Sequence, residues 1–109
     1  MSSDVRWRAR QRVKFLKLTL YVNGDSVLSR RAIVNIRRII ADHLSHLPRG
    51  QALEIVDVHR EPDRAETARI LATPTLVRHT RGLERRVSGD LSHAARVLEI
   101  LELSDVPSE

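Results

Sequence analysis

Two histidines stand at a spacing that could hold a metal ion. His43 and His46 are three residues apart, and Asp42 or His59 could complete a set of ligands. Residues three apart in a helix share one face. The pair is nevertheless a weak signal, because no HExxH pattern accompanies it and surface histidines are far more common. We therefore predict no metal site and no cofactor.

The hydroxyl and carboxyl groups do not form a recognisable catalytic set. Ser26 or Ser29 would need an activating base to act as a nucleophile, and none is evident nearby in the sequence. Nothing in the sequence pairs Asp57, Asp63 and Asp90 as an acid and a base. Asp63 and Asp90 stand at expected helix starts, where serine and aspartate commonly act as caps. The chain has no cysteine, which excludes thiol chemistry. We predict that the chain is not an enzyme.

The charge balance is basic, with 19 lysines and arginines against 14 acidic residues and a formal net charge of +5. Such a balance permits binding to nucleic acid or to an acidic protein surface. Binding to single strands also needs aromatic side chains for stacking, and aromatics make up only 3% of the chain. We therefore do not expect a nucleic-acid partner. Residues 1–12 hold the local arginine cluster, and we expect them to form a basic flexible tail.

Length and composition indicate one globular domain. The chain has 109 residues, of which 41% are hydrophobic and 30% are charged, and this length suits a single core. We place the folded domain at residues 13–104 and expect a frayed C-terminus at residues 105–109. No stretch approaches the roughly 20 apolar residues of a membrane span. We predict a cytoplasmic protein with no membrane partner.

The first half of the chain reads as strand, helix, strand. Alternating apolar residues predict a strand at 13–22, and a turn follows at 23–26. Ser26 or Ser29 could cap the next helix, which we expect to run to about Leu47. Its apolar stripe contains Ala32, Ile33, Ile36, Ile40, Leu44 and Leu47. A second strand at 52–58 completes a βαβ unit, which implies two parallel strands.

The second half adds a short helix, a hairpin and a final helix. Glu61-Pro62-Asp63 opens the short helix, because proline suits the first turn. We expect strands at 74–79 and 84–88 around a turn that contains Gly82. Ser92 is predicted to cap a last helix at 93–103. The fold class is therefore α/β, with the order βαβαββα and a mixed sheet.

This order resembles that of the thioredoxin fold. In that fold a proline, commonly with a cis peptide bond, stands just before the third strand. The stretch LATPTL places Thr73-Pro74 at the corresponding position. The resemblance makes Thr73 and Pro74 markers of the fold.

Four longer segments together resemble the KaiB family, the small partner proteins of the circadian clock ATPase KaiC. They are LTLYVNGDSVLSRRAIVNIRRI (18–39), LEIVDVHREPDRAE (53–66), ILATPTLVR (70–78) and RRVSGDLS (85–92). The resemblance implies a family that switches folds, and the alternative is the KaiB ground-state fold with a rearranged C-terminal half. The composition of residues 91–103 favours a helix there, and hence the thioredoxin-like state.

The resemblance also implies functional residues and partners. Arg85 and Arg86 match the basic pair of the family and become candidates for partner contact, and Gly89 and Asp90 match the turn of the switch region. The implied function is non-catalytic binding to a KaiC-like ATPase that regulates circadian or related timing, with a homo-oligomeric state, dimer or tetramer. The alternative is a thioredoxin-like regulatory module that binds a histidine kinase or a stress-signalling partner.

Overall fold

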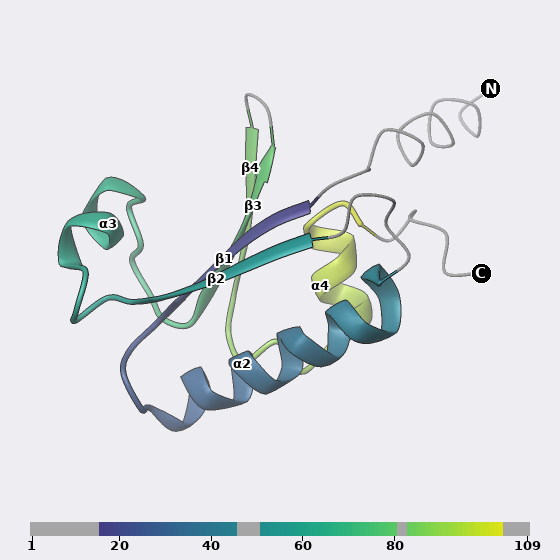
Figure 1. The fold of residues 1–109 in the computed structure, drawn as a ribbon, viewed down its shortest axis with the longest axis horizontal. Helices are drawn as coiled ribbons and strands as arrows, with labels where there is room; N and C mark the ends of the chain where they lie inside the picture. The colour runs from purple at the N-terminus through teal and green to yellow at the C-terminus, as the bar shows by residue number, and fades with distance from the viewer. Residues whose placement is uncertain (1–15, 46–50, 81–82, 104–109) are drawn as a thin grey trace.

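The computed structural model describes residues 16–45, 51–80 and 83–103. Within these residues the chain forms a four-stranded sheet with helices on its faces (Figure 1). The elements are β1 (Leu16–Val22), α2 (Val27–Ile39), a π-helical segment (Ile40–Leu44), β2 (Gln51–Asp57), α3 (Pro62–Thr67), β3 (Thr75–Thr80), β4 (Leu83–Ser88) and α4 (Ala94–Ile100). The predicted order βαβαββα is confirmed.

The sheet is mixed, as the sequence predicts. Its strand order is β2-β1-β3-β4, so β2 and β4 form its two edges. β1 pairs with β2 in parallel and with β3 in antiparallel, and β3 pairs with β4 in antiparallel. Along the chain, α2 lies between the two parallel strands β1 and β2, which is the order that a βαβ unit requires.

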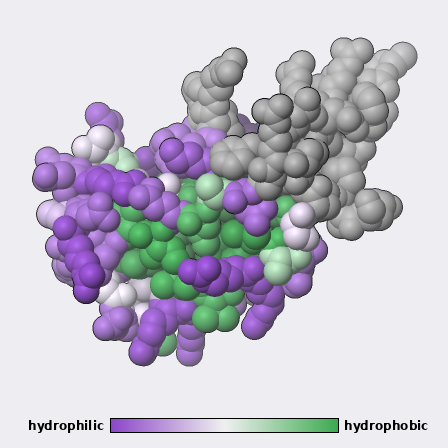
Figure 2. Space-filling model, in the orientation of Figure 1, coloured by the Kyte–Doolittle hydropathy of each residue, from purple (hydrophilic) through white to green (hydrophobic). Residues whose placement is uncertain are grey.

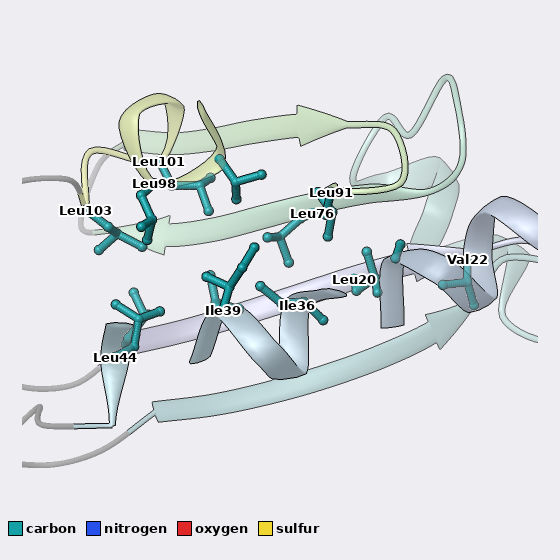
Figure 3. Close-up of a cluster of buried hydrophobic side chains, with 14 residues drawn as sticks. Leu20, Val22, Ile36, Ile39, Leu44, Leu76, Leu91, Leu98, Leu101 and Leu103 are labelled. Atoms are coloured by element: carbon teal, nitrogen blue, oxygen red, sulfur yellow. The ribbon is translucent and has the colours of Figure 1, made fainter. Parts of the chain in front are cut away.

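One face of the sheet carries the main core, beneath α2 and α4 (Figure 3). Alternate residues of β1 point into it, including Leu18 and Leu20, which are fully buried. α2 contributes Ile36 and Ile39, and the chain around α4 contributes Leu98 and others. Burying a leucine or isoleucine side chain stabilises the fold by roughly 1.5–3 kcal/mol. This aliphatic core fixes the position of α2 relative to the sheet.

The opposite face holds a smaller cluster. Tyr21, Val56 and Val77 are buried there, from three neighbouring strands. Ala68 and Ile70, at and just after the end of α3, pack against them. β1 is therefore an internal strand with apolar contacts on both faces, as its sequence predicts.

Several details differ from the sequence prediction. The apolar stripe of α2 is rotated, because Ile39 is buried while Ile33 and Ile40 are only partly buried. The α-helical geometry ends at Ile39 and a π-helical segment continues to Leu44. Leu44 is buried as predicted, and the change of helical period brings it to the core five residues after Ile39.

The predicted helix caps are only partly correct. Ser26 caps α2, since its hydroxyl accepts from the backbone N–H of Ser29 at 3.2 Å. Ser92 does not cap α4, which begins at Ala94 without a side-chain cap. The Ser92 N–H instead donates to the Asp90 carboxylate at 3.0 Å, so Asp90 closes a turn before the helix. Asp63 likewise lies inside the first turn of α3 and is not its cap.

The C-terminal half adopts the thioredoxin-like arrangement. Residues 94–100 form α4, which agrees with the helix that the composition of residues 91–103 predicts. α4 ends at Ile100, earlier than the predicted residue 103. The predicted tail at 1–12, the frayed end at 105–109 and the turn at 81–82 lie outside the described residues.

Candidate partner-binding surfaces

Arg85 and Arg86 lie side by side in sequence but on opposite faces of β4. Successive side chains of a strand alternate between its two faces. Arg85 pairs in register with Arg78 of β3, whose side chain reaches the end of α4, and Arg86 pairs with Val77. The two arginines that the sequence groups as one basic pair therefore belong to two different environments.

Arg85 and Arg78 hold the chain just after α4. The Arg78 Nη1 donates to the carbonyl oxygens of Leu101 at 2.7 Å and Glu102 at 3.2 Å. The Arg85 Nε donates to the Glu102 carboxylate at 2.8 Å. Burial lowers the pKa of the Arg78 guanidinium. Cations at the C-terminus of a helix can bind its last carbonyls. Arg78 does so directly and Arg85 binds the Glu102 side chain, so both side chains position α4.

Arg86 makes the equivalent contact on the other face. Its Nη1 donates to the carbonyl of Arg69 at 3.0 Å, and its Nη2 donates to the carbonyl of Ala68. Both carbonyls belong to residues that directly follow α3. The side chain of Arg86 remains 36% exposed and that of Arg85 39% exposed, so each keeps one edge in solvent. We call Arg78, Arg85 and Arg86 the hairpin arginines.

A cavity of about 430 Å³ lies beside Arg86, between α3 and the sheet. One of the arginines that line it, Arg64, is already paired. It binds the Glu54 carboxylate through both Nη atoms at 2.5 and 2.7 Å. This bidentate contact lowers the pKa of Glu54. Asp63 and Glu84 also line the cavity, so it does not present an uncompensated positive charge to an anion.

The fold-marker residues are brought together in space. The Thr73–Pro74 peptide bond is cis. The Pro74 carbonyl accepts from the N–H of Gly89 at 3.0 Å, which joins the start of β3 to the turn after β4. Gly89 has a φ of 114°, a value that disfavours residues with a Cβ. The Ser92 hydroxyl and N–H hold the pKa of Asp90 below its usual range.

The turn between β1 and α2 is held by two serine hydroxyls. The Ser26 hydroxyl accepts from the Ser29 N–H, and the Ser29 hydroxyl accepts from the Asn23 N–H at 3.0 Å. Ser29 is fully buried. Both hydroxyls therefore serve the turn and the helix start, as the capping interpretation predicts.

A polar chain that sequence reasoning missed crosses three strands. The Thr19 hydroxyl is 2.8 Å from His79 Nε2, and His79 Nδ1 is 3.3 Å from the Glu84 carboxylate. The order hydroxyl, imidazole, carboxylate resembles that of a nucleophilic triad. Thr19 is only 1% exposed, however, so no substrate can reach its hydroxyl. These three side chains link β1, β3 and β4. The sequence does not reveal the link, because Thr19 lies 60 positions before His79.

Only one member of the histidine pair lies within the described residues. His43 is half-buried, and His46 lies outside the described residues. No group of three or more histidine, aspartate or glutamate side chains among the described residues could hold a metal ion. Within the same ranges, no helix combines the length and apolarity needed to cross a membrane.

A second surface lies between α2 and the edge strand β2. Figure 2 shows hydrophobic side chains gathered there, surrounded by hydrophilic ones. Ile33 of α2, Ile40 of the π-helical segment, and Leu53 and Ile55 of β2 are only partly buried. A cavity of about 450 Å³ opens at one end of this strip. It is lined by Arg37, Ile40, Ala41, Ser45, Gln51 and Leu53.

The exposed side of α2 is strongly basic. It presents four exposed arginines: Arg30, Arg31, Arg37 and Arg38, which we call the helix arginines. α2 contains no acidic residue, and within the described residues none of the four forms an ion pair with a carboxylate. Val34 lies between them and is 56% exposed. The sequence prediction singled out only the arginine cluster at residues 1–12 and did not identify this surface.

The KaiB domain model matches residues 19–103, from within β1 to just beyond the end of α4. The chain belongs to the KaiB family. The circadian clock protein KaiB3 of Synechocystis sp. is 40% identical over 86 residues, covering 79% of this chain and 81% of that protein. The circadian clock oscillator protein KaiB of one Prochlorococcus marinus strain is 41% identical, covering 79% of this chain and 71% of that protein.

Solved structures place this KaiB-family chain in the thioredoxin-like fold. It is similar to the N-terminal domain of Synechococcus elongatus SasA, with a TM-score of 0.64, 25% identity and coverage of 82% of this chain and 85% of that one. It also matches the Drosophila thioredoxin Deadhead, with a TM-score of 0.63, 11% identity and coverage of 94% and 92%. The second match speaks only for the fold.

Proposed function

We propose that this chain is a non-catalytic, cytoplasmic KaiB-type protein that docks on a KaiC-type ATPase and regulates circadian or related timing. The observation that carries the proposal is the KaiB domain match over residues 19–103. The relatives named as circadian clock proteins support the same assignment at about 40% identity.

The α2–β2 surface is our first candidate for the contact. Protein interfaces combine an apolar centre with a polar rim, and here Ile40 and Leu53 form an apolar strip next to the helix arginines. Arginine is enriched at such interfaces, because its guanidinium pairs with carboxylates through two hydrogen bonds. An acidic surface of the ATPase would complement this side of α2 and would accelerate association.

Arg85 and Arg86 are proposed as secondary contacts. The resemblance to the family assigns partner contact to this pair, and each side chain keeps a solvent-exposed edge. Their internal hydrogen bonds make them positioning residues first, so a partner would meet them already fixed in place. Gly89 and Asp90 would contribute as the turn of the switch region.

Native mass spectrometry of the chain mixed with the KaiC-type ATPase of its host tests the docking proposal. We expect a complex, and we expect the double variant Arg30→Glu, Arg37→Glu to lose most of it, because Arg37 lines the cavity beside the strip and Arg30 lies seven residues earlier on the same side of α2. The double variant Arg60→Glu, Arg96→Glu is the charge-matched control, because both residues are exposed and belong to neither α2 nor β2. Failure to form any complex, with or without ATP, would overturn the proposal.

The same spectra report the state of the free chain. The resemblance to the family predicts a homo-oligomer, dimer or tetramer. A chain that remains a monomer over the whole accessible concentration range contradicts this expectation without affecting the docking proposal.

A second candidate function is a regulatory module for a histidine kinase or another signalling protein. The similarity to the N-terminal domain of SasA favours it. Deletion of the gene would then impair a stress or signalling response, and the purified chain would not bind the KaiC-type ATPase. An ATPase complex with loss of rhythm on deletion would favour the first candidate instead.

A further inference from the structure

We propose that Asn23 is a site of spontaneous deamidation whose amide is activated by His59. Asn23 is exposed and precedes Gly24 in the turn between β1 and α2. Gly24 has a φ of 48° and no Cβ to hinder the approach of its own backbone nitrogen to the neighbouring side chain. The proposal concerns a covalent change of this chain and is independent of the docking function.

The reaction needs no component other than water. The Gly24 nitrogen attacks the Asn23 side-chain carbon Cγ and loses its proton, a C–N bond forms, and the side-chain amide leaves as ammonia. The resulting cyclic imide adds water at either carbonyl. One product is aspartate, and the other is isoaspartate, in which the backbone continues through the side chain.

His59 is placed to assist the first step. Its Nε2 lies 2.5 Å from the Asn23 Oδ1, so the tautomer with a proton on Nε2 donates to the oxygen that becomes negative during the attack. Fixed donors at such an oxygen lower the barrier. The backbone N–H of His59 donates to the Asp57 Oδ1 at 2.9 Å, which holds the histidine in the turn.

The Asp57 carboxylate completes the arrangement. Its Oδ2 would be 3.9 Å from a Cβ placed on Gly24, so it lies beside the attacking residue. Hydrogen bonds from the backbone N–H groups of His59 and Gly24 lower the pKa of this carboxyl. A carboxylate near the N–H is suited to accept the proton that Gly24 must lose. Asn23 and His59 meet because β1 and β2 are parallel and end together, with Val22 opposite Asp57.

The product would change the start of α2. The Asn23 N–H donates to the Ser29 hydroxyl, and the Asn23 carbonyl accepts from the Ser26 N–H at 3.1 Å. An isoaspartate inserts an extra carbon into the backbone between these two contacts. A new carboxylate would also stand close to Asp57. Both changes weaken the turn that fixes the first residues of α2.

Peptide mapping of the aged, folded protein tests the proposal. Trypsin releases residues 18–30, in which Asn23 is the only side-chain amide, and residues 32–37, which contain Asn35. Asn35 precedes Ile36 within α2 and donates to the Asp90 carbonyl, so it serves as the internal control. We expect aspartate and isoaspartate to accumulate at Asn23 and not at Asn35. Equal retention of both amides would overturn the assignment of the site.

Variants of His59 test the assistance. His59 is exposed, so His59→Ala should leave the fold intact, which circular dichroism checks. We expect deamidation at Asn23 to slow several-fold in His59→Ala and to recover in part in His59→Gln, which keeps a side-chain donor. An unchanged or faster rate in both variants contradicts the role of His59. Aspartate without isoaspartate would contradict attack by Gly24.

Discussion

The helix arginines and the hairpin arginines show two uses of the same side chain. The hairpin arginines donate to carbonyl and carboxylate oxygens of their own chain, at the ends of α3 and α4. The helix arginines stand on a helix without acidic residues, and within the described part of the chain they have no carboxylate partner. A guanidinium with internal acceptors positions secondary structure, whereas one without them remains available to another molecule.

Arg78 gives the strongest test of the structural role. Arg78→Ala removes the donor to the Leu101 and Glu102 carbonyls and leaves a gap under α4. Hydrogen bonds from charged groups contribute about 1.5–3 kcal/mol, so we expect the free energy of unfolding to fall by about that amount. Urea denaturation measures it. A loss below about 0.5 kcal/mol, the range of ordinary surface substitutions, would contradict a structural role for Arg78.

Arg86 should give a smaller effect on the other face. Arg86→Ala removes two hydrogen bonds at the end of α3, and we expect a loss of about 1–2 kcal/mol. Hydrogen exchange should quicken in α3 and remain slow in α4. Arg86→Lys is the matched variant, because lysine keeps the positive charge but lacks the planar guanidinium that donates two hydrogen bonds side by side. Full recovery by lysine would show that charge alone accounts for the contact.

Arg85 should matter less than either. Its ion pair with Glu102 is partly exposed, and such pairs contribute roughly 0.2–1 kcal/mol. We expect Arg85→Ala and Glu102→Ala each to cost less than about 1 kcal/mol. Their double-mutant cycle should give a coupling within that range, and the coupling should shrink as salt is added. A coupling that is insensitive to salt would contradict an exposed pair.

The helix arginines should have the smallest effect on stability. Arg30→Glu with Arg37→Glu changes exposed residues that have no carboxylate partner within the described residues, so we expect the free energy of unfolding to change by less than about 0.5 kcal/mol. Thermal and urea denaturation measure it beside the Arg60→Glu, Arg96→Glu control. Destabilisation comparable to that of Arg86→Ala would mean that these side chains also position structure.

The element order was predictable because each element carries a local signal. Alternation marks β1, and the Ser26 cap and the apolar stripe mark α2. Thr73-Pro74 marks the entry to β3. The sequence also placed α4 correctly as a helix, although not its cap or its end.

The organisation of the arginines was not predictable, because it depends on contacts between distant residues. Arg85 and Arg86 are neighbours in sequence, and only the pairing of β4 with β3 separates their environments. The link from Thr19 to His79 spans 60 positions. The basic side of α2 was visible in principle, since four arginines occupy one helix that lacks acids. It was missed because charge was judged along the chain and not around the helix.

The affinity of the KaiC-type ATPase for three versions of the chain tests the central claim most directly. The three are the natural sequence, Arg30→Glu with Arg37→Glu, and Arg85→Ala, measured by titration calorimetry at low and moderate salt. We predict that the helix variant binds at least about tenfold more weakly, a loss of about 1.4 kcal/mol, and that Arg85→Ala, at a secondary contact, loses clearly less affinity than the helix variant. Full affinity in the helix variant together with a large loss in Arg85→Ala would contradict the account.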